Sequence, residues 1–403
     1  MARILFTWEL GGGLGHLVRY KGLIASLVQD GHQIHYIARN AEKVGFVNPQ
    51  PEIQVAELSP AFTPRPQQII EPRLASYSTL LFNCGFSDVD SLAARLQRWV
   101  VTIKAIRPDC IVADHSPTAL LANRVLGIPL IIAGNGFTLP PANQPMPLFQ
   151  PEKSENPAIN LDFENRLCGI LNASIRKIGS NTPDLASPSE LLTVDQSWLM
   201  TFKEFDCYEL RAGGTYLGTY PNDAFGENFD WPVATGPKVF AYLGSAKGLE
   251  ALGQWVTDQD ASLCLVMPKL NDKCRQIIQK SFPTKNIYLS EKPVSFSKIA
   301  NEATLGISNG NANTVANLAL AGLPQLAIPL SMENYMEARQ TVRARCGLML
   351  PGPDFSKLGA KLSELVDNAI YRQAARNFNL KYAGSSSETQ TQHMLNKLHE
   401  LLV

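Results

Sequence analysis

The chain has no net charge and no long uninterrupted apolar run. Among its 403 residues, Lys plus Arg and Asp plus Glu both number 36, so the formal net charge is zero. A broad basic surface of the kind that binds nucleic acid is therefore not expected. No apolar stretch approaches the roughly 20 residues that cross a bilayer, so we predict no transmembrane segment, and only peripheral contact with a membrane stays open.

Paired cysteines are also lacking. The seven cysteines form no C-x-x-C pair and stand at positions 84, 110, 168, 207, 264, 274 and 346. An odd number without a disulfide framework is typical of reduced thiols. We therefore expect a cytoplasmic protein.

The sequence does contain a repeated alternation of strands and helices. In the first half, strands are predicted at 3–8, 33–38, 110–113 and 129–133, and a helix is predicted at 14–29. In the second half, strands are predicted at 238–243, 262–267, 286–289, 304–307 and 325–328. This alternation builds parallel sheets through right-handed crossovers.

Irregular stretches divide the chain. A proline-rich loop is predicted at 135–161, and a stretch rich in glycine, proline and asparagine follows at 215–237. We predict an α/β protein with two Rossmann-like parallel-sheet domains that face a central cleft, with ligands at the carboxyl ends of the strands. The predicted parts are an N-terminal domain at 1–218, a linker at 219–237, a C-terminal domain at 238–386, and a helix at 387–403 that packs back towards the first domain.

The first candidate site is a glycine-rich turn, Gly11-Gly12-Gly13-Leu14-Gly15-His16, which joins a strand to a helix. A dinucleotide fingerprint, G-x-G-x-x-G, is the alternative, but His16 stands where a third glycine is needed for close helix–strand packing. The turn still presents backbone N–H groups and the positive end of a helix dipole. It therefore suits a phosphate or a charged transition state.

His16 and Asp114 are the candidate catalytic residues. His16 projects from a strand–glycine–helix junction, which favours a general base over a structural histidine. Asp114 ends a buried strand and points at the same edge, where a carboxylate would hold the imidazole in the correct tautomer. The alternative for Asp114 is a cap of the following helix. We expect the neighbouring His115 to face elsewhere.

A polar loop in the second half is a candidate phosphate cradle. A predicted strand runs into Ser308-Asn309-Gly310-Asn311-Ala312-Asn313-Thr314, which opens a helix. Asn and Gly tolerate the left-handed backbone that such a loop needs. Its backbone N–H groups, together with the Asn and Thr side chains, predict diphosphate binding.

With these motifs, the sequence resembles the GT-B glycosyltransferases of the UDP-glucuronosyl/glucosyltransferase and macrolide-glycosyltransferase group. The resemblance spans nearly the whole chain and is carried by the Gly11–His16 loop, PDCIVADHSPTALLANRVLGIP, NGNANT with its downstream AGLPQLAIPL, and MENYMEAR. It implies an inverting, metal-independent hexosyltransferase. The donor is expected to be a nucleotide-diphosphate sugar, chiefly a UDP-sugar, and the acceptor a hydroxyl of a small hydrophobic molecule.

The resemblance also implies residue roles. His16 would deprotonate the acceptor hydroxyl, with Asp114 as its partner in the N-terminal, acceptor-binding domain. The acceptor would lie against the proline-rich loop, chiefly Asn135 and Phe137. No metal and no other cofactor is implied. The donor-binding residues would be Gly13, Gly15, Ser308, Asn309, Gly310, Asn311, Asn313, Thr314, Glu333 and Asn334.

The donor loop departs from the pattern of that group. The usual His-Gly-Gly-x-Gly-Thr is Asn-Gly-Asn-Ala-Asn-Thr at 309–314, and the usual Gln after the acidic residue is Asn334. Asn keeps a hydrogen-bond donor but carries no charge. A weakly catalytic binding or activator subunit is therefore one alternative, although His16 and Asp114 argue against it. The other alternative, a nucleotide-sugar 2-epimerase, would need acidic catalytic groups, and the sequence offers no convincing set.

Metal-binding patterns are weak. Asp88-Val89-Asp90 resembles the D-x-D metal motif of the other glycosyltransferase fold, but it stands at a helix start, where Asp favours the helix dipole. His32 and His35 lie on opposite faces of a predicted strand and cannot share a metal. We therefore predict no metal site.

Overall fold

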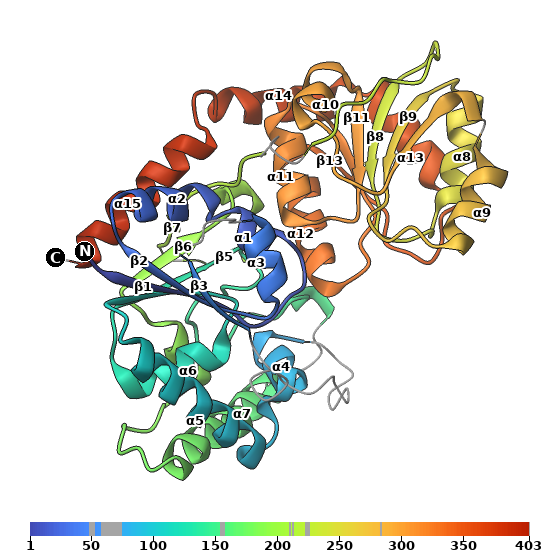
Figure 1. The fold of residues 1–403 in the computed structure, drawn as a ribbon. Coiled ribbons are helices and arrows are strands. Elements are labelled where there is room, and N and C mark those ends of the chain that lie inside the picture. Colours follow the sequence, from blue (N-terminus) through green and yellow to red (C-terminus); the bar gives the residue numbers. More distant parts are fainter. Residues whose placement is uncertain are drawn as a thin grey trace. The chain divides into compact units, whose positions relative to one another are not determined.

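The computed structural model describes residues 1–47, 53–57, 75–153, 158–208, 211, 213–221, 226–282 and 284–402 (Figure 1). They form two compact units. The first comprises the described residues within Met1–Met200, Tyr208–Gly218 and Glu388–Val403, and the second comprises those within Thr201–Cys207 and Thr219–Ser387. Each unit carries a sheet of parallel strands, which confirms the predicted α/β class.

The sheet of the first unit has the strand order β3-β2-β1-β4-β5-β6-β7, and every pair is parallel. All residues of β4 and β5 are buried. Central parallel strands are typically apolar along their whole length, because helices cover both faces of such sheets. The strands are β1 (Arg3–Trp8), β2 (Gln33–Ala38), β3 (Gln54–Glu57), β4 (Cys110–Asp114), β5 (Leu130–Gly134), β6 (Gln196–Leu199) and β7 (Thr215–Tyr216).

Helices of the first unit begin and end at local signals. The Asp88 side chain caps α5 by accepting a hydrogen bond from the Ser91 backbone N–H at 2.8 Å, and Gly127 ends α6 with φ +68°. The helices are α1 (Gly15–Val18), α2 (Lys21–Gln29), α3 (Ala41–Val47), α4 (Tyr77–Leu81) with a π-helical turn at Phe82–Phe86, α5 (Val89–Ile106), α6 (Pro117–Leu126), α7 (Ala158–Lys177) and α15 (Ser387–Leu402), with 3₁₀ turns at Pro151–Lys153 and Pro188–Leu192.

The helix predicted at 14–29 is divided into α1 and α2. The Tyr20 backbone N–H donates to the Leu17 carbonyl at 3.1 Å. This bond reaches back three residues instead of four, so it tightens the chain and interrupts the α-helical ladder. The prediction of one continuous helix is wrong. Buried apolar residues such as Leu17, Ile24 and Leu27 keep a helical spacing of seven and three residues across the break, so the pattern does not reveal it.

The last helix, α15, completes the core of the first unit. Met394, Leu395 and Leu398 belong to the same apolar cluster as residues of β1, α2 and β4. A Cβ atom on Gly22 of α2 would lie 2.5 Å from Thr391 Oγ1. The two helices therefore approach each other closely, at a position where a larger residue would clash.

The sheet of the second unit has the order β10-β9-β8-β11-β12-β13, again with parallel pairs. Its strands are β8 (Lys238–Tyr242), β9 (Ser262–Val266), β10 (Ile287–Ser290), β11 (Leu305–Ser308), β12 (Gln325–Ala327) and β13 (Gly347–Met349). Its helices are α8 (Leu249–Asp258), α9 (Asp272–Ser281), α10 (Phe296–Glu302), α11 (Ala312–Leu320), α12 (Met332–Arg343), α13 (Leu358–Asp367) and α14 (Ala369–Lys381), with 3₁₀ turns at Lys203–Phe205 and Thr284–Asn286.

Several elements are absent from the sequence-based prediction. β3, β6, β7 and β13 contain four residues or fewer and were not predicted. Helix α7 begins at Ala158, inside the predicted loop at 135–161, which is therefore too long. Leu167 and Leu171 of α7 are fully buried, and this apolar face stabilises a helix directly after the prolines.

Candidate functional site

β1 and β4 end side by side, and this register places the first candidate site. Trp8, the last residue of β1, pairs with Asp114, the last residue of β4. The segments that follow both strands therefore leave the same edge of the sheet. The Leu10 backbone N–H donates to the His115 carbonyl at 3.0 Å, which ties the two segments together.

His16 and Asp114 form a hydrogen-bonded pair at this edge. His16 Nδ1 lies 2.8 Å from Asp114 Oδ1. The side chain of Asp114 is 2% exposed and that of His16 is 15% exposed. A carboxylate only accepts hydrogen bonds, so this contact assigns the proton to Nδ1 and leaves the lone pair on Nε2. The imidazole is therefore arranged to accept a proton at Nε2.

The second oxygen of Asp114 is also bound. Tyr20 Oη donates to Asp114 Oδ2 at 2.7 Å, and Arg19 Nη1 lies 3.6 Å from the same oxygen. Burial alone would raise the pKa of this carboxyl. The charges of Arg19 and His16 and the hydrogen bonds from His16 and Tyr20 outweigh burial, so the pKa of Asp114 is lowered. Asp114 is therefore ionised at neutral pH.

Gly11 leaves the space that the His16 ring occupies. Its φ is +84°, and a Cβ atom there would lie 2.4 Å from His16 Nε2. The Trp8 ring stacks on the His16 ring with centroids 5.6 Å apart and planes inclined by 20°. Glycine is thus required next to the imidazole for both steric and conformational reasons.

Gly13 and Gly15, the predicted donor-binding glycines, lie in the same turn. A Cβ atom on Gly13 would approach only the Gly15 nitrogen, at 3.9 Å, so the space beside Gly13 is open. The Gly15 carbonyl accepts a hydrogen bond from Arg19 Nε at 2.7 Å. Gly15 therefore helps to orient Arg19, and donor binding by both glycines stays a prediction.

His115 lies beside His16, and the expectation that it faces elsewhere is wrong. Its φ of +43° is left-handed, and this conformation directs the residue differently from a continuing strand. The His115 ring centroid lies 6.2 Å from that of His16 and 6.1 Å from that of Tyr77. Burial and the neighbouring His16 lower the pKa of His115 to about 3. His115 is therefore neutral at physiological pH.

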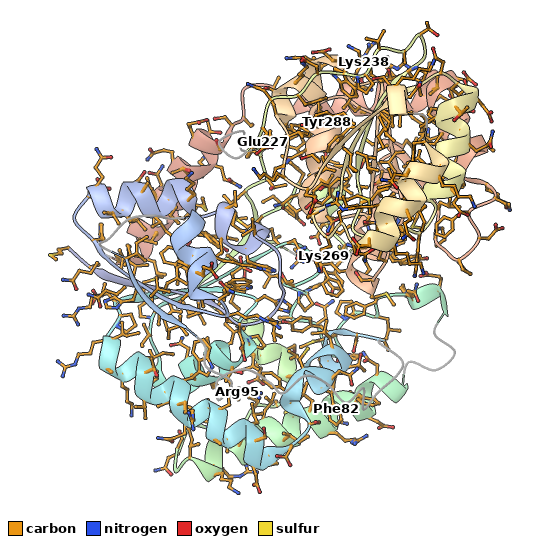
Figure 2. All side chains as sticks on the ribbon, turned by 45° about the vertical axis from the view of Figure 1, so that its right-hand side comes forward. Phe82, Arg95, Glu227, Lys238, Lys269 and Tyr288 are labelled. Atoms are coloured by element: carbon orange, nitrogen blue, oxygen red, sulfur yellow. The ribbon has the colours of Figure 1, made fainter. Side chains whose placement is uncertain are left out.

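A buried carboxylate next to the site was missed from the sequence. Glu9 follows β1, and its Oε2 accepts a hydrogen bond from the Thr118 backbone N–H at 2.8 Å. Arg95 of α5 (Figure 2) places its Nε 3.8 Å from Glu9 Oε1. Glu9 therefore caps the first turn of α6, which is the role that was the alternative for Asp114.

Asn135 and Phe137, the predicted acceptor-binding residues, are buried in the loop after β5. Asn135 Oδ1 accepts hydrogen bonds from the Thr138 backbone N–H at 3.1 Å and from Thr138 Oγ1 at 2.9 Å. The Phe137 ring lies 5.0 Å from that of Phe149. These contacts give both side chains a part in loop packing, and their contact with an acceptor stays a prediction.

The second candidate site lies at the carboxyl end of β11 in the second unit. Asn309 Oδ1 accepts a hydrogen bond from the Gly244 backbone N–H at 2.6 Å, and Asn309 Nδ2 donates to the Ile328 carbonyl at 2.9 Å. Gly244 follows β8 and Ile328 follows β12, the two neighbours of β11. Asn309 therefore joins three strand ends and positions the loop.

Gly310 brings the loop against the start of α12. Its φ is +78°, and a Cβ atom there would lie 2.6 Å from the Asn334 carbonyl oxygen. Asn334 Nδ2 donates to the Gly310 carbonyl at 3.5 Å, and the Gly310 N–H donates to Ser308 Oγ at 3.1 Å. The structure thus brings the predicted pair of Glu333 and Asn334 next to the predicted phosphate loop.

The first turn of α11 carries the other predicted donor residues. Asn311 caps this helix without a side-chain cap bond, and Asn313 Oδ1 accepts a hydrogen bond from Thr219 Oγ1 at 3.3 Å. The N–H groups of the first turn, at 312–314, have no acceptor within the helix. This end of α11 therefore offers donors and a positive dipole to an anion.

Asp88 and Asp90 have local partners. Asp88 caps α5, as described above, and Asp90 forms an ion pair with Lys177. In the described part of the chain, no group of three or more His, Cys, Asp or Glu side chains is placed to hold a metal ion. The helices described here also include none with the length and apolarity needed to cross a membrane.

Solved structures share this architecture over the full length of the chain. The calicheamicin glycosyltransferase CalG4 matches with a TM-score of 0.70 and 16% identity over 99% of both chains. The glycosyltransferase VinC, solved in complex with DTDP, matches with a TM-score of 0.68 and 16% identity over 99% of both chains. The glycosyltransferase SnogD from Streptomyces nogalater matches with a TM-score of 0.62 and 17% identity, over 100% of this chain and 99% of its own.

These likenesses establish the fold. The chain has the GT-B fold, as its resemblance to the GT-B glycosyltransferases implies, with a parallel Rossmann-like sheet in each unit. No protein-family model and no curated protein matches the sequence. The residues at the two strand edges are therefore the features from which a function can be inferred.

We predict that Gly11→Ala displaces the His16 ring, whereas Gly12→Ala leaves it in place. The added methyl group would overlap Nε2 at position 11, but at position 12 it would meet no atom within 4 Å. A histidine-selective NMR spectrum, with the His16 signals identified by their loss in His16→Ala, should change in the first variant only. Wild-type His16 signals in Gly11→Ala would contradict this account.

Proposed function

We propose that the protein transfers a sugar from a nucleotide-diphosphate donor to a hydroxyl of a small hydrophobic acceptor, with inversion at the anomeric carbon. The observation that carries the proposal is the His16–Asp114 pair, with Nδ1 and Oδ1 2.8 Å apart at a strand edge. The fold supports it, because the solved structures that share the fold include the glycosyltransferases CalG4, VinC and SnogD.

In the proposed reaction, His16 Nε2 accepts the proton of the acceptor hydroxyl. The hydroxyl oxygen forms a bond to the anomeric carbon while the bond from that carbon to the diphosphate oxygen breaks, and a single displacement inverts the configuration. The ionised Asp114 holds Nδ1–H and stabilises the imidazolium that forms. The nucleoside diphosphate leaves with the electron pair of the broken bond.

The donor diphosphate is proposed to bind at the first turn of α11. The N–H groups at 312–314 and the Thr314 hydroxyl would donate hydrogen bonds, and the helix dipole would offset part of the negative charge. Asn309 uses its amide on Gly244 and Ile328, so we assign it to positioning the loop. Glu333 would accept hydrogen bonds from sugar hydroxyls, and Asn334 would hold the Gly310 backbone beside them.

We predict that the transfer needs no metal ion. The proposed leaving-group site uses helix N–H groups, and Asp88 and Asp90 are engaged in a helix cap and an ion pair. An excess of EDTA should therefore leave kcat unchanged. Loss of activity on chelation, with recovery on addition of Mg²⁺ or Mn²⁺, would overturn this part of the mechanism.

We predict that His16→Ala lowers kcat by about 10²–10⁴-fold, the usual contribution of a general base. Donor affinity, measured by calorimetry, should remain close to that of the wild type, because His16 acts on the acceptor. Asp114→Asn should lower kcat less, since it acts through His16. Comparable kcat in His16→Ala and wild type would remove His16 from the mechanism.

The two parts of the donor site should be separable by calorimetry. Thr314→Ala should weaken binding of the free nucleoside diphosphate and of the intact sugar donor alike. It removes a hydrogen bond to a charged oxygen, worth about 1.5–3 kcal/mol. Glu333→Ala should weaken binding of the sugar donor only, because the proposed partner of Glu333 is a sugar hydroxyl. Absence of binding across a panel of nucleotide sugars would favour the alternative of a binding or activator subunit.

A further inference from the structure

One helical stretch supplies three groups to a single carboxylate. His16, Arg19 and Tyr20 are spaced by three and four residues, so they project from one side of the α1–α2 segment. His16 binds Asp114 Oδ1 at 2.8 Å. Tyr20 donates to Oδ2 at 2.7 Å, and Arg19 Nη1 lies 3.6 Å from Oδ2.

These three groups share the negative charge of Asp114. Each hydrogen bond or positive charge on Oδ2 stabilises the carboxylate and reduces the charge available to the proton on His16. Tyr20 stays a proton donor at working pH, because burial and the Asp114 charge raise its pKa well above the usual value. Arg19 remains positively charged throughout.

We propose that Tyr20 and Arg19 are positioning residues that limit how strongly Asp114 holds a proton on His16, and so set the pH range in which His16 accepts one. This inference rests on the proposed function for its kinetic consequence. Its effect on the protonation of the His16 ring can be measured without any substrate.

The expected effect has a definite sign. When Oδ2 loses the Tyr20 hydroxyl or the Arg19 charge, more of the Asp114 charge acts on His16. The protonated imidazole is then stabilised, and His16 becomes protonated at a higher pH. The acid limb of the kcat–pH profile should therefore move to higher pH, by about 0.5–1 unit for loss of one such neighbour.

Other titratable groups near Asp114 must keep the same charge over the pH range of this test. Tyr36 and Tyr77 are buried and carry raised pKa values to which burial and Asp114 both contribute. His115 is neutral, because burial and nearby charges lower its pKa to about 3. None of the three changes charge between pH 5 and 8. Burial raises the pKa of the neighbouring Glu9 carboxyl, so the NMR titration of the His16 ring assigns the acid limb to the His16–Asp114 pair.

Tyr36 also provides a matched control. Its ring lies 5.7 Å from that of Phe6, as does the ring of Tyr20, and both tyrosines are buried. The Tyr36 hydroxyl is buried and has no hydrogen-bond partner among the described residues. Tyr36→Phe therefore removes the same atom at the same depth without removing a bond to Asp114.

The experiment compares Tyr20→Phe, Arg19→Met and Tyr36→Phe with the wild type. The kcat–pH profile is measured with a nucleotide sugar that the wild type turns over, and the His16 ring is titrated by NMR without substrate. Tyr20→Phe and Arg19→Met should move both midpoints to higher pH, with the donor KM unchanged. Tyr36→Phe should reproduce the wild-type midpoints.

The outcomes separate this inference from the proposed function. Wild-type midpoints in Tyr20→Phe and Arg19→Met, with turnover that depends on His16, would overturn the inference alone. The same shift in Tyr36→Phe would also overturn it, because the effect would then come from the core. If no nucleotide sugar is turned over, the proposed function fails, and the NMR titration still decides whether these residues control the His16–Asp114 pair.

Discussion

The organisation of the first unit depends on one buried carboxylate with both oxygens engaged. A charged group at the end of a central strand is costly unless every oxygen is matched. Asp114 meets this condition through His16 on one oxygen and Tyr20 with Arg19 on the other. These contacts account for the close approach of the α1–α2 segment to β4. The same contacts fix the His16 ring beside the turn before α1. Glycine is needed at position 11 because any side chain there would clash with that ring.

In the second unit, a neutral side chain occupies the corresponding place at the end of a central strand. Asn309 joins the ends of β8, β11 and β12 through backbone N–H and carbonyl groups, where the resembled glycosyltransferases carry a histidine. An amide can satisfy one donor and one acceptor at the same time, which an acceptor-only carboxylate cannot. Asn309 therefore fixes the shape of the loop, and the proposed anion site is left to the N–H groups at the start of α11.

Much of this arrangement follows from the sequence, because buried strands and the residues at their ends are visible in it. β1 and β2 have their predicted bounds. His16 and Asp114 were predicted to meet because His16 follows the first strand and Asp114 ends another at the same edge. Their neighbours were not predicted. The spacing of His16, Arg19 and Tyr20 was a usable signal, but its meaning depended on where the carboxylate lies. The partners of Asn309 stand 65 and 19 residues away, and no local pattern specifies such contacts.

The position of α15 has a consequence for how the chain is made. The apolar cluster around β1 includes Met394 and Leu398, near the other end of the sequence. During synthesis, the ribosome releases the strands of the first unit long before these residues exist. All strands of the second unit have also been synthesised by then, while the part of the first unit's apolar cluster that α15 covers remains exposed. A nascent chain stalled between the second unit and α15 should therefore be a natural substrate for chaperones.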